Sequence, residues 1–333
     1  PIGDALRPDV LRVLGGLPAN VPASRLGLAK WLMAREHPLV SRVLVNRIWQ
    51  RTFGLGLVRT PEDFGVQGQQ ETHPALLDWL AVELMEHDWD LQHILKLIVT
   101  SRTYQQQSDV TPELLTRDPE NRLLARGARF RLPSWMIHDA ALQASGLLNP
   151  AQGGPPVMPY QPPGVWAEMF MGRFTYEPSQ GAAQYRRSLY AFWRRSSAPT
   201  FLFDSAQRRV CEVQPRRTNT PLQALTLLND VTILESSREL ARTAIQQEQT
   251  PPERIDFIAQ RILSRVLTAR EQTVLEREYE QSRDYYQSHP EAALQLLDVG
   301  QPPAKSKVAP DELASWMVVA SMIFNLDEAI THE

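Results

Sequence analysis

Residues 216–230, Arg-Arg-Thr-Asn-Thr-Pro-Leu-Gln-Ala-Leu-Thr-Leu-Leu-Asn-Asp, join a pair of arginines to the start of a helix. Thr220 is a favoured N-cap residue, and Pro221 follows at the first helical position, where proline is well tolerated. Leu222, Leu225 and Leu228 then recur at the spacing of one helical face. The stretch therefore predicts a capped helix that begins at Pro221 and turns these leucines inward.

Similar signals predict helices along the first part of the chain, which we take as a helical subregion over residues 1–148. Polar caps and a proline mark their starts, and a glycine ends one of them. The predicted helices run from Ser24 to Leu32, from Val40 to Gly54, from Pro74 to Asp88, from Asp90 to Val99, and from Pro133 to Leu142. A turn-rich loop over residues 54–70 and a polar break over 111–121 separate them.

The middle of the chain has a different composition. Residues 149–164 contain six prolines and three glycines, which neither a helix nor a central strand accepts. Residues 165–176 and 187–194 are rich in aromatic and apolar side chains, which favours a small antiparallel β ribbon. We therefore expect a loop and β insert over residues 149–219.

Helices return in a third subregion, residues 220–333. After the helix at Pro221, the apolar spacing predicts helices over residues 231–246, 251–266 and 311–325. Thr268 and Glu271 form a capping-box pattern for a charged helix that reaches Tyr286. The predicted fold class is mainly α, a multi-helix domain spanning residues 1–333 with a central irregular Pro/Gly-rich insert and a small antiparallel β ribbon.

The composition is that of an ordinary globular protein. Of 333 residues, 43% are hydrophobic, which is enough for a substantial core. No run of about eighteen apolar residues occurs, so we expect no membrane span, and no basic-then-apolar leader opens the chain. Because the chain begins with Pro1, we expect it to be a fragment of a longer protein.

Cys211 is the single cysteine in the sequence. One cysteine excludes an internal disulfide, a cysteine-rich zinc site and the Cys-x-x-Cys-His pattern of haem attachment. We interpret Cys211 as a small buried hydrophobic residue rather than a reactive thiol. We therefore expect neither a cofactor nor a metal in this chain.

Charge is unevenly distributed along the chain, although the net charge is only -3. Residues 173–217 carry nine arginines against three acids, whereas residues 235–333 carry seventeen acids against ten bases. Arginine pairs with carboxylates in planar, bidentate geometry. We therefore expect the basic centre to dock on the acidic end of the same molecule. The arginines are Arg173, Arg186, Arg187, Arg194, Arg195, Arg208, Arg209, Arg216 and Arg217.

The first candidate site consists of Arg216, Arg217, Asn219 and Thr220. Free N–H groups and positive charge at a helix N-terminus favour a bound carboxylate, sulfate or phosphate. Alternatively, the arginines pair with acids such as Asp63 or Asp204 and hold the insert against the helices. We favour this structural interpretation, although the same geometry serves both roles.

A second candidate site combines His73 with Glu62, Asp63 and Asp204, which could perform acid/base chemistry or hold a metal. His73 lies beside a predicted helix start, where a structural hydrogen bond is the usual role, and the histidines lack His-x-x-x-His or His-Glu-x-x-His spacing. Asp118 and Glu120 could also form a glycosidase pair, at a separation that the sequence leaves open.

Aromatic residues of the insert are the third candidate. They are Tyr160, Trp166, Phe170, Phe174, Tyr176, Tyr190 and Trp193. Exposed rings can stack on sugars, but a loop with few aliphatic residues needs rings for its own core, so we favour packing. The acidic overall charge argues against nucleic acid as a partner. Phosphate-loop, dinucleotide-binding and nucleophile-elbow motifs are absent from the sequence.

Further segments occur in the order seen in a known family. They are LAKWL at 28–32, VNRIW at 45–49, RTPEDFG at 59–65, THPALLDWL at 72–80, HILKLIVTS at 93–101, DPENRLL at 118–124, GGPPV at 153–157 and NLDE at 325–328. Together with residues 216–230, they make the chain resemble a domain of unknown function from the C-terminal end of large exported planctomycete-type proteins.

The resemblance implies an extracytoplasmic parent protein that often carries an uncharacterised domain or a cytochrome-c-like haem domain upstream. It suggests links to polysaccharide breakdown or surface redox work and brings no catalytic residues. Our leading hypothesis is a noncatalytic accessory or interaction domain, with upstream domains of the parent or glycans as partners. The alternatives are a carbohydrate-active hydrolase with a carboxylate pair near the insert and a docking module for an upstream haem domain.

Overall fold

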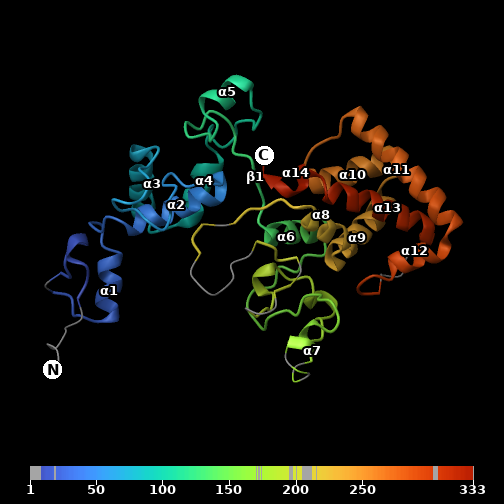
Figure 1. Ribbon diagram of the computed structural model, residues 1–333, viewed down its shortest axis with the longest axis horizontal. Helices are drawn as coiled ribbons and strands as arrows, with labels where there is room; N and C mark the ends of the chain where they lie inside the picture. Colours follow the sequence, from blue (N-terminus) through green and yellow to red (C-terminus); the bar gives the residue numbers. More distant parts are fainter. Residues whose placement is uncertain are drawn as a thin grey trace. The chain divides into compact units, whose positions relative to one another are not determined.

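The computed structural model describes residues 9–18, 20–169, 171, 173, 175–194, 198–199, 201–204, 212–214, 216–302 and 307–332. Within these ranges it contains fourteen α-helices and a two-stranded antiparallel sheet, which confirms the predicted mainly-α fold (Figure 1). The chain divides after Phe130 into two compact units, a boundary that falls inside the first predicted helical subregion. Outside the described residues lie Cys211, Arg195, Arg208, Arg209, Phe170 and Phe174.

The first unit is built around three helices. Its elements are η1 (Arg12–Leu14), α1 (Arg25–Leu32), α2 (Val40–Phe53), α3 (Pro74–Glu86), α4 (Leu91–Val99) and α5 (Pro112–Arg117). One face each of α2, α3 and α4 forms the core, where Trp49 stacks on Phe53 with ring centroids 4.1 Å apart. Helix α5 lies in the stretch predicted as a polar break, and the Thr111 side chain caps it by accepting from Leu114 N–H. A single capped turn with one proline is too short for periodicity to reveal.

Asn46 explains the Val45–Trp49 motif of the first unit. Its side chain is fully buried on α2 and pairs with the backbone of Val58, accepting from the N–H at 2.9 Å and donating to the carbonyl at 3.0 Å. A Cβ atom on Gly56 would overlap both Asn46 and the Val58 carbonyl. The asparagine therefore replaces a strand partner for the loop that follows α2.

The second unit is organised by helix α13. Its helices are α6 (Ser134–Ser145), α7 (Val165–Met169), α8 (Pro221–Asn229), α9 (Val231–Gln247), α10 (Pro251–Leu263), α11 (Ala269–Ser288), α12 (Pro290–Leu297), α13 (Pro310–Phe324) and α14 (Asp327–Ile330). Helix α13 is nearly all apolar and packs against α9, α10, α11 and α12 (Figure 1). Its Trp316 is fully buried and stacks on Tyr279 of α11 at 4.1 Å.

The predicted position of the β ribbon is wrong. The two strands, β1 (Phe130–Arg131) and β2 (Thr331–His332), lie outside the insert. Residues 165–176 begin with helix α7, and residues 187–194 contain the 3-10 turn η3 (Ser188–Tyr190); a further 3-10 turn, η2 (Gly181–Ala183), precedes it. Single parallel bridges, Asn149 with Arg186 and Val157 with Ala191, are the ladder-like pairing described in this part of the chain.

The Arg186 side chain provides hydrogen bonds that strand pairing would otherwise provide in this part of the chain. Its buried guanidinium donates to the carbonyl oxygens of Ala151, Gly153 and Pro155, and it lies over the Tyr190 ring with 3.7 Å to the centroid. A buried arginine with five donors can satisfy several loop carbonyls at once. The Pro/Gly-rich segment is therefore held by a side chain instead of by strand pairing.

In the part of the chain that the structure describes, none of the helices is both long and apolar enough to cross a bilayer. This finding agrees with the sequence, which lacks a long apolar run.

Replacing Trp316 with alanine is expected to lower the free energy of unfolding by about 3–5 kcal/mol, because it leaves a large cavity in the α13 core. Leu294→Ala on the exposed side of α12 is the control, with an expected loss below about 0.5 kcal/mol. Urea unfolding monitored by far-UV circular dichroism measures both free energies. Equal losses would contradict the central role of α13.

Asn46→Ala is expected to destabilise the first unit by about 1–3 kcal/mol for each Val58 backbone group left buried without a partner. Amide exchange at Val58 is the direct readout and should accelerate strongly. Asn229→Ala removes a solvent-exposed side-chain bond to the Leu225 carbonyl and should have little effect. Unchanged Val58 exchange in Asn46→Ala would show that other contacts hold the loop.

Candidate functional site

The residues that open α8 form a capping box. The Thr220 hydroxyl accepts a hydrogen bond from the Gln223 N–H at 3.3 Å, and the Gln223 side-chain oxygen accepts one from the Thr220 N–H at 3.2 Å. These bonds satisfy donors that a helix start leaves free. The predicted start of the helix, with Thr220 as cap and Pro221 at the first position, is confirmed.

The Asp204 carboxylate ties the preceding chain to this helix start. It accepts from the Thr218 N–H at 2.7 Å, from the Thr218 hydroxyl at 2.9 Å and from the Gln223 side-chain amide at 3.3 Å. The same Gln223 amide also donates to the Thr218 hydroxyl at 2.7 Å. A carboxylate of the chain itself thus binds the segment just before α8 and the Gln223 side chain in its first turn.

The two candidate arginines differ in exposure. The Arg216 side chain is 62% exposed and lies 3.8 Å from the Glu212 carboxylate, whereas Arg217 is half-buried. An ion pair with that exposure contributes little to stability. Anion binding at this position stays a prediction, and Arg216 is the cation that an external anion would reach first.

Asn219 is the third member of this candidate site. Its side-chain oxygen accepts from the Arg131 guanidinium at 2.7 Å, and Arg131 also lies over the Phe203 ring at 5.5 Å. Burial lowers the pKa of Arg131, and the charges of Asp204 and Asp327 oppose that shift. Arg131, at the start of the second unit, thus links the stretch before α8 to the residues around Asp204.

Acids of the C-terminal helices find arginines within those helices. Glu312 pairs with Arg254 at 2.8 Å, and Glu328 pairs with Arg265 at 2.5 Å. Arg265 also binds Glu271 at 2.7 Å. These pairs join α10 to α13, and they join the loop after α10 to α11 and α14. None of these three pairs involves the basic stretch 173–217, so they give the predicted docking of the two regions no support.

The leucine face of α8 is oriented opposite to the prediction. Leu222 and Leu225 are 71% and 55% exposed, whereas Gln223 and Leu227 are buried. The physical reason is that Gln223 must turn inward to complete the capping box and reach Asp204. Leu227 lies one helical turn further along the same face, so the remaining leucines turn outward.

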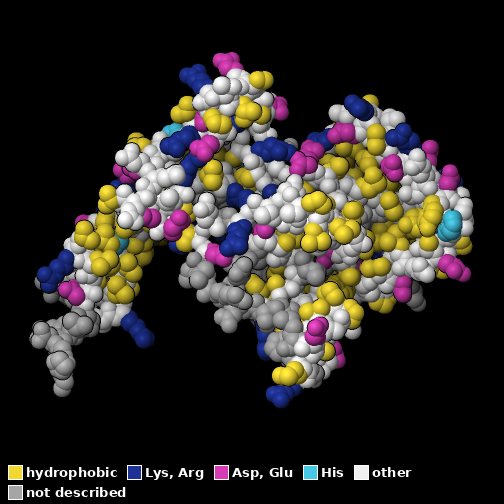
Figure 2. Space-filling model, viewed as in Figure 1, with side chains coloured by type: hydrophobic (Ala, Val, Ile, Leu, Met, Phe, Trp, Pro, Cys, Tyr) yellow, Lys and Arg dark blue, Asp and Glu magenta, His cyan; other side chains and the backbone are white. Residues whose placement is uncertain are grey.

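These exposed leucines line a groove of the second unit. It has a volume of about 650 Å³, and hydrophobic side chains lie at the surface over α8 (Figure 2). Two segments line the groove: Tyr160, Gln161, Pro162 and Pro163 from the insert, and Leu222, Leu225, Thr226, Asn229, Asp230 and Val231 from α8 and the start of α9. Among the described residues that line it, Asp230 is the one with a charged side chain, and it is buried. The groove therefore suits an uncharged, apolar ligand.

The proline-rich wall of the groove is anchored from behind. The Tyr160 hydroxyl donates to Glu235 Oε1 at 3.0 Å, and the Gln161 side-chain oxygen accepts from the indole N–H of Trp166 at 3.0 Å. Glu235 is 1% exposed and also accepts from the Gln301 N–H at 2.6 Å. Two buried polar contacts thus fix a loop that its prolines already stiffen.

Burial raises the pKa of the Glu235 carboxyl, while hydrogen bonds from Gln301 and Tyr160 and the charge of Arg238 oppose the rise. Burial and the same carboxylate raise the pKa of Tyr160 well above its usual value. A Cβ atom on Gly300 would overlap the Glu235 carboxyl, so a glycine is required there. This carboxylate is enclosed by the protein and has a structural role.

His138, Asp139 and Ser188 form a polar cluster near Asp230. Asp230 caps α9 by accepting from the N–H groups of Thr232 and Ile233, and burial raises its pKa while the nearby His138 lowers it. His138 Nδ1 lies 3.0 Å from the Ser188 hydroxyl and 3.2 Å from Asp139 Oδ1. In a catalytic triad the serine and the aspartate contact opposite ring nitrogens. Both contact the same nitrogen here, so the cluster lacks the relay arrangement.

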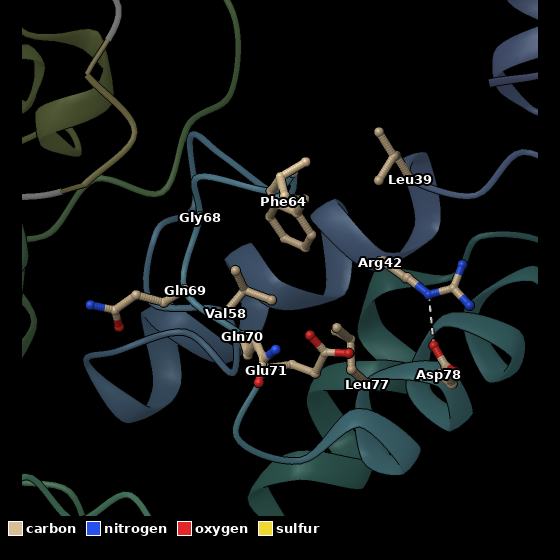
Figure 3. Close-up of a pocket in the computed structure, with 12 residues that line it drawn as sticks. Leu39, Arg42, Val58, Phe64, Gly68, Gln69, Gln70, Glu71, Leu77 and Asp78 are labelled. Atoms are coloured by element: carbon tan, nitrogen blue, oxygen red, sulfur yellow. Dashed lines mark hydrogen bonds and ion pairs between the residues drawn. The ribbon is translucent and has the colours of Figure 1, made fainter. Parts of the chain in front are cut away.

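The first unit has a smaller pocket of about 290 Å³, lined by residues 64–71 together with α2 and α3 (Figure 3). At its edge, Arg42 Nε lies 2.6 Å from Asp78 Oδ1. The Glu71 carboxylate points inward near Leu77, whereas the Gln69 amide points away (Figure 3). The pocket thus presents one carboxylate and an ion pair that is already formed, without the converging acid and base of an enzyme site.

The second candidate site is not assembled in the first unit. Asp63 Oδ1 accepts from the Gly65 N–H at 2.7 Å within its own turn, and His73 Nδ1 lies 3.0 Å from the neighbouring Thr72 hydroxyl. Glu62 is exposed in the same loop. Asp204 belongs to the second unit, where Thr218 and Gln223 bind it. Each of the bonds described here is local.

Asp118 and Glu120 also have separate structural contacts. Asp118 is buried and accepts from the N–H groups of Arg122 and Leu123, and these bonds lower the pKa of its carboxyl against the opposing effect of burial. Glu120 pairs with Arg59 of the Arg59–Gly65 motif at 2.7 Å. The contacts described for the two carboxylates hold a loop in place, and a glycosidase role for the pair stays a prediction.

Trp166 is buried in the core of the insert. It is 3% exposed and stacks on Tyr176 with ring centroids 4.9 Å apart, while Phe192 lies 5.7 Å away. This geometry agrees with packing rather than sugar stacking for Trp166. By contrast, the sequence predicts that Leu222 and Leu225 turn inward, whereas both lie at the surface. The glutamine at the third helical position after Thr220 is the sequence signal that would have revealed them.

The fold and the groove together describe a mainly helical protein with a largely apolar groove over α8. Residues 24–279, more than half of the chain, match the family described as "PSD1: Protein of unknown function (DUF1553)", and the chain belongs to that family. No curated protein and no solved structure matches the chain. The resemblance deduced from the ordered motifs is thereby confirmed as membership of a family of unknown function.

The stability of the wild type relative to Glu235→Gln is expected to decline as pH rises above about 4.5, the ordinary glutamate pKa. The raised pKa means that folding favours the protonated Glu235 carboxyl. The stability that this carboxyl contributes is fully present below its pKa in the unfolded state and is lost as pH rises through its pKa in the folded state. Urea unfolding at several pH values between 4 and 8 measures the difference. Glu280→Gln, at an exposed position of α11, is the control and should follow the wild type. Parallel curves for Glu235→Gln would contradict the account.

Proposed function

We propose that the chain is an interaction domain of a larger exported protein and that it binds an apolar segment of a protein partner in the groove over α8. One observation carries the proposal: Leu222 and Leu225 are exposed along a groove that is also lined by residues 160–163, where the Tyr160 hydroxyl is bound to buried Glu235. Exposed apolar side chains gathered at a concave surface commonly mark a binding site.

The lining favours a particular kind of partner. Leucines and prolines provide apolar contact, while Gln161, Thr226 and Asn229 offer neutral hydrogen-bonding groups. An uncharged segment with two or three apolar side chains would fit the volume without burying an unpaired charge. We propose an upstream domain of the same parent protein as the source of this segment, in keeping with the family resemblance. An upstream haem domain is one form that such a partner could take.

The carboxylates near the groove favour binding over hydrolysis. Asp230 is engaged as the cap of α9, and Glu235 is enclosed by Tyr160 and Gln301. A glycosidase needs two carboxyl groups facing a bound sugar. These two side chains instead stabilise the wall and the floor of the groove. Polysaccharide processing would then belong to other domains of the parent protein, with this chain as an accessory.

The test is selection of a random peptide library on the immobilised chain. The wild type should enrich peptides with two or more apolar residues and no net charge. Leu225→Asp should weaken binding of the enriched peptides at least about tenfold, because a charge at the groove must be desolvated. Leu294→Asp is the matched control, since Leu294 is also 55% exposed but lies on α12.

Three results would contradict the proposal. Enriched peptides could bind Leu225→Asp as tightly as the wild type, or Leu294→Asp could lose binding equally. A glycan array could instead yield saturable sugar binding that Leu225→Asp abolishes, which would assign the groove to glycans. Circular dichroism of each variant separates a lost surface from a lost fold.

A further inference from the structure

The turn between α3 and α4 brings three metal-ligating side chains together in the first unit. Glu83 lies in the last turn of α3, His87 directly follows that helix, and His93 lies in the first turn of α4. Glu83 Oε1 is 2.8 Å from His93 Nε2 and 3.4 Å from His87 Nδ1. One ligand atom from each residue lies within 4.8 Å of the other two.

Packing and hydrogen bonds fix the backbone conformation of this turn. Asp88 and Trp89 both have left-handed conformations, with φ of 51° and 61°, which side chains of this size rarely adopt. The Trp89 N–H donates to the Leu84 carbonyl, and its side chain packs against the core of the unit. Asp90 then caps α4 by accepting from the N–H groups of Gln92 and His93. Packing and capping together hold a costly turn that places the two histidines face to face.

The three side chains are close enough to share one coordinated ion. Ligand atoms about 2.0–2.2 Å from a tetrahedral zinc ion lie about 3.3–3.5 Å from one another. The 3.4 Å separation between Glu83 Oε1 and His87 Nδ1 falls in that range. The 2.8 Å separation between Glu83 Oε1 and His93 Nε2 is that of a direct hydrogen bond, which a bound ion would replace. The imidazole rings stack with centroids 3.8 Å apart and planes 13° from parallel. Because the rings are nearly parallel, their lone pairs lie in separate planes, so both rings must turn before the lone pairs meet at one ion. In that change His87 Nδ1 would give up its 3.0 Å contact with the Glu83 carbonyl.

We infer that Glu83, His87 and His93 bind one divalent transition-metal ion of the zinc class. Two imidazoles and one carboxylate suit zinc, whereas magnesium and calcium prefer oxygen ligands alone. The side chains of Glu83, His93 and His87 are 20%, 27% and 46% exposed, so an ion can reach them and a further position stays open to water. The site is independent of the α8 groove.

The sequence predicts no metal because its histidines lack the usual spacings. Here a glutamate precedes one histidine by four residues on a helix, and the second histidine follows six residues later across a turn. Only the left-handed conformation of Asp88 and Trp89 brings that second histidine back. The pattern could therefore be recognised only with the turn geometry in hand.

The test is isothermal titration of the full chain with zinc chloride after dialysis against a chelator. The wild type should bind one equivalent, and Glu83→Gln and His93→Ala should each weaken binding by at least about tenfold, the lower range for disturbing a metal site. Magnesium chloride should give no saturable binding. His289→Ala is the matched control, because His289 also follows a helix, and its Nδ1 lies 3.0 Å from the Tyr285 carbonyl.

The inference is overturned if the wild type shows no saturable zinc binding, or if binding survives unchanged in Glu83→Gln and His93→Ala. It is also overturned if His289→Ala reduces binding as much as they do, since that would indicate scattered surface histidines. Glu83→Gln preserves the shape of the side chain, and thermal melts of every variant confirm that a loss of binding is not a loss of folding. Cobalt titration supports the site if it yields the intense visible bands of tetrahedral coordination.

Discussion

The hydrogen bond from the Gln223 side-chain amide to the Asp204 carboxylate determines which face of α8 turns toward the core. Gln223 completes the capping box with Thr220 and also donates to the Asp204 carboxylate, so this side of the helix must face inward. Leu227 follows on the same face and joins the core. The remaining leucines are thereby directed toward solvent, where they line the groove. A polar contact at one residue thus sets the orientation of an apolar surface on the opposite face.

The rest of the second unit keeps that surface in place. Helix α9 begins at Asp230, which lies on the floor of the groove, and one turn later it presents Glu235 to the Tyr160 hydroxyl. Helix α9 also packs on α13, whose buried face dominates the core. Helix α9 therefore contributes to the lining of the groove, anchors Tyr160 and packs in the core. This arrangement gives a partner a preformed groove, which lowers the ordering cost of binding.

The sequence could predict most helices because their boundaries carry local signals. Ser24, Asp90, Thr220 and Thr268 all cap helices where expected, and Gly54 ends α2. The missed α-helices, α5, α7, α12 and α14, are six, five, eight and four residues long. Their short apolar pattern gives a weak periodic signal.

Side-chain roles were harder to predict because they depend on distant partners. The inward face of α8 depends on Asp204, nineteen residues before Gln223. The misplaced ribbon reflects Arg186, whose donors replace strand pairing across the proline-rich loop. The carboxylates offered as catalytic candidates bind backbone N–H groups or arginines close by, which composition and spacing do not reveal.

The most direct measurement is methyl NMR of leucine-labelled chain titrated with a peptide selected on it. The account predicts that the methyl signals of Leu222 and Leu225 shift together and saturably, while those of Leu294 on α12 stay in place. Saturable shifts confined to leucines away from α8 would contradict the claim that this groove is the binding surface.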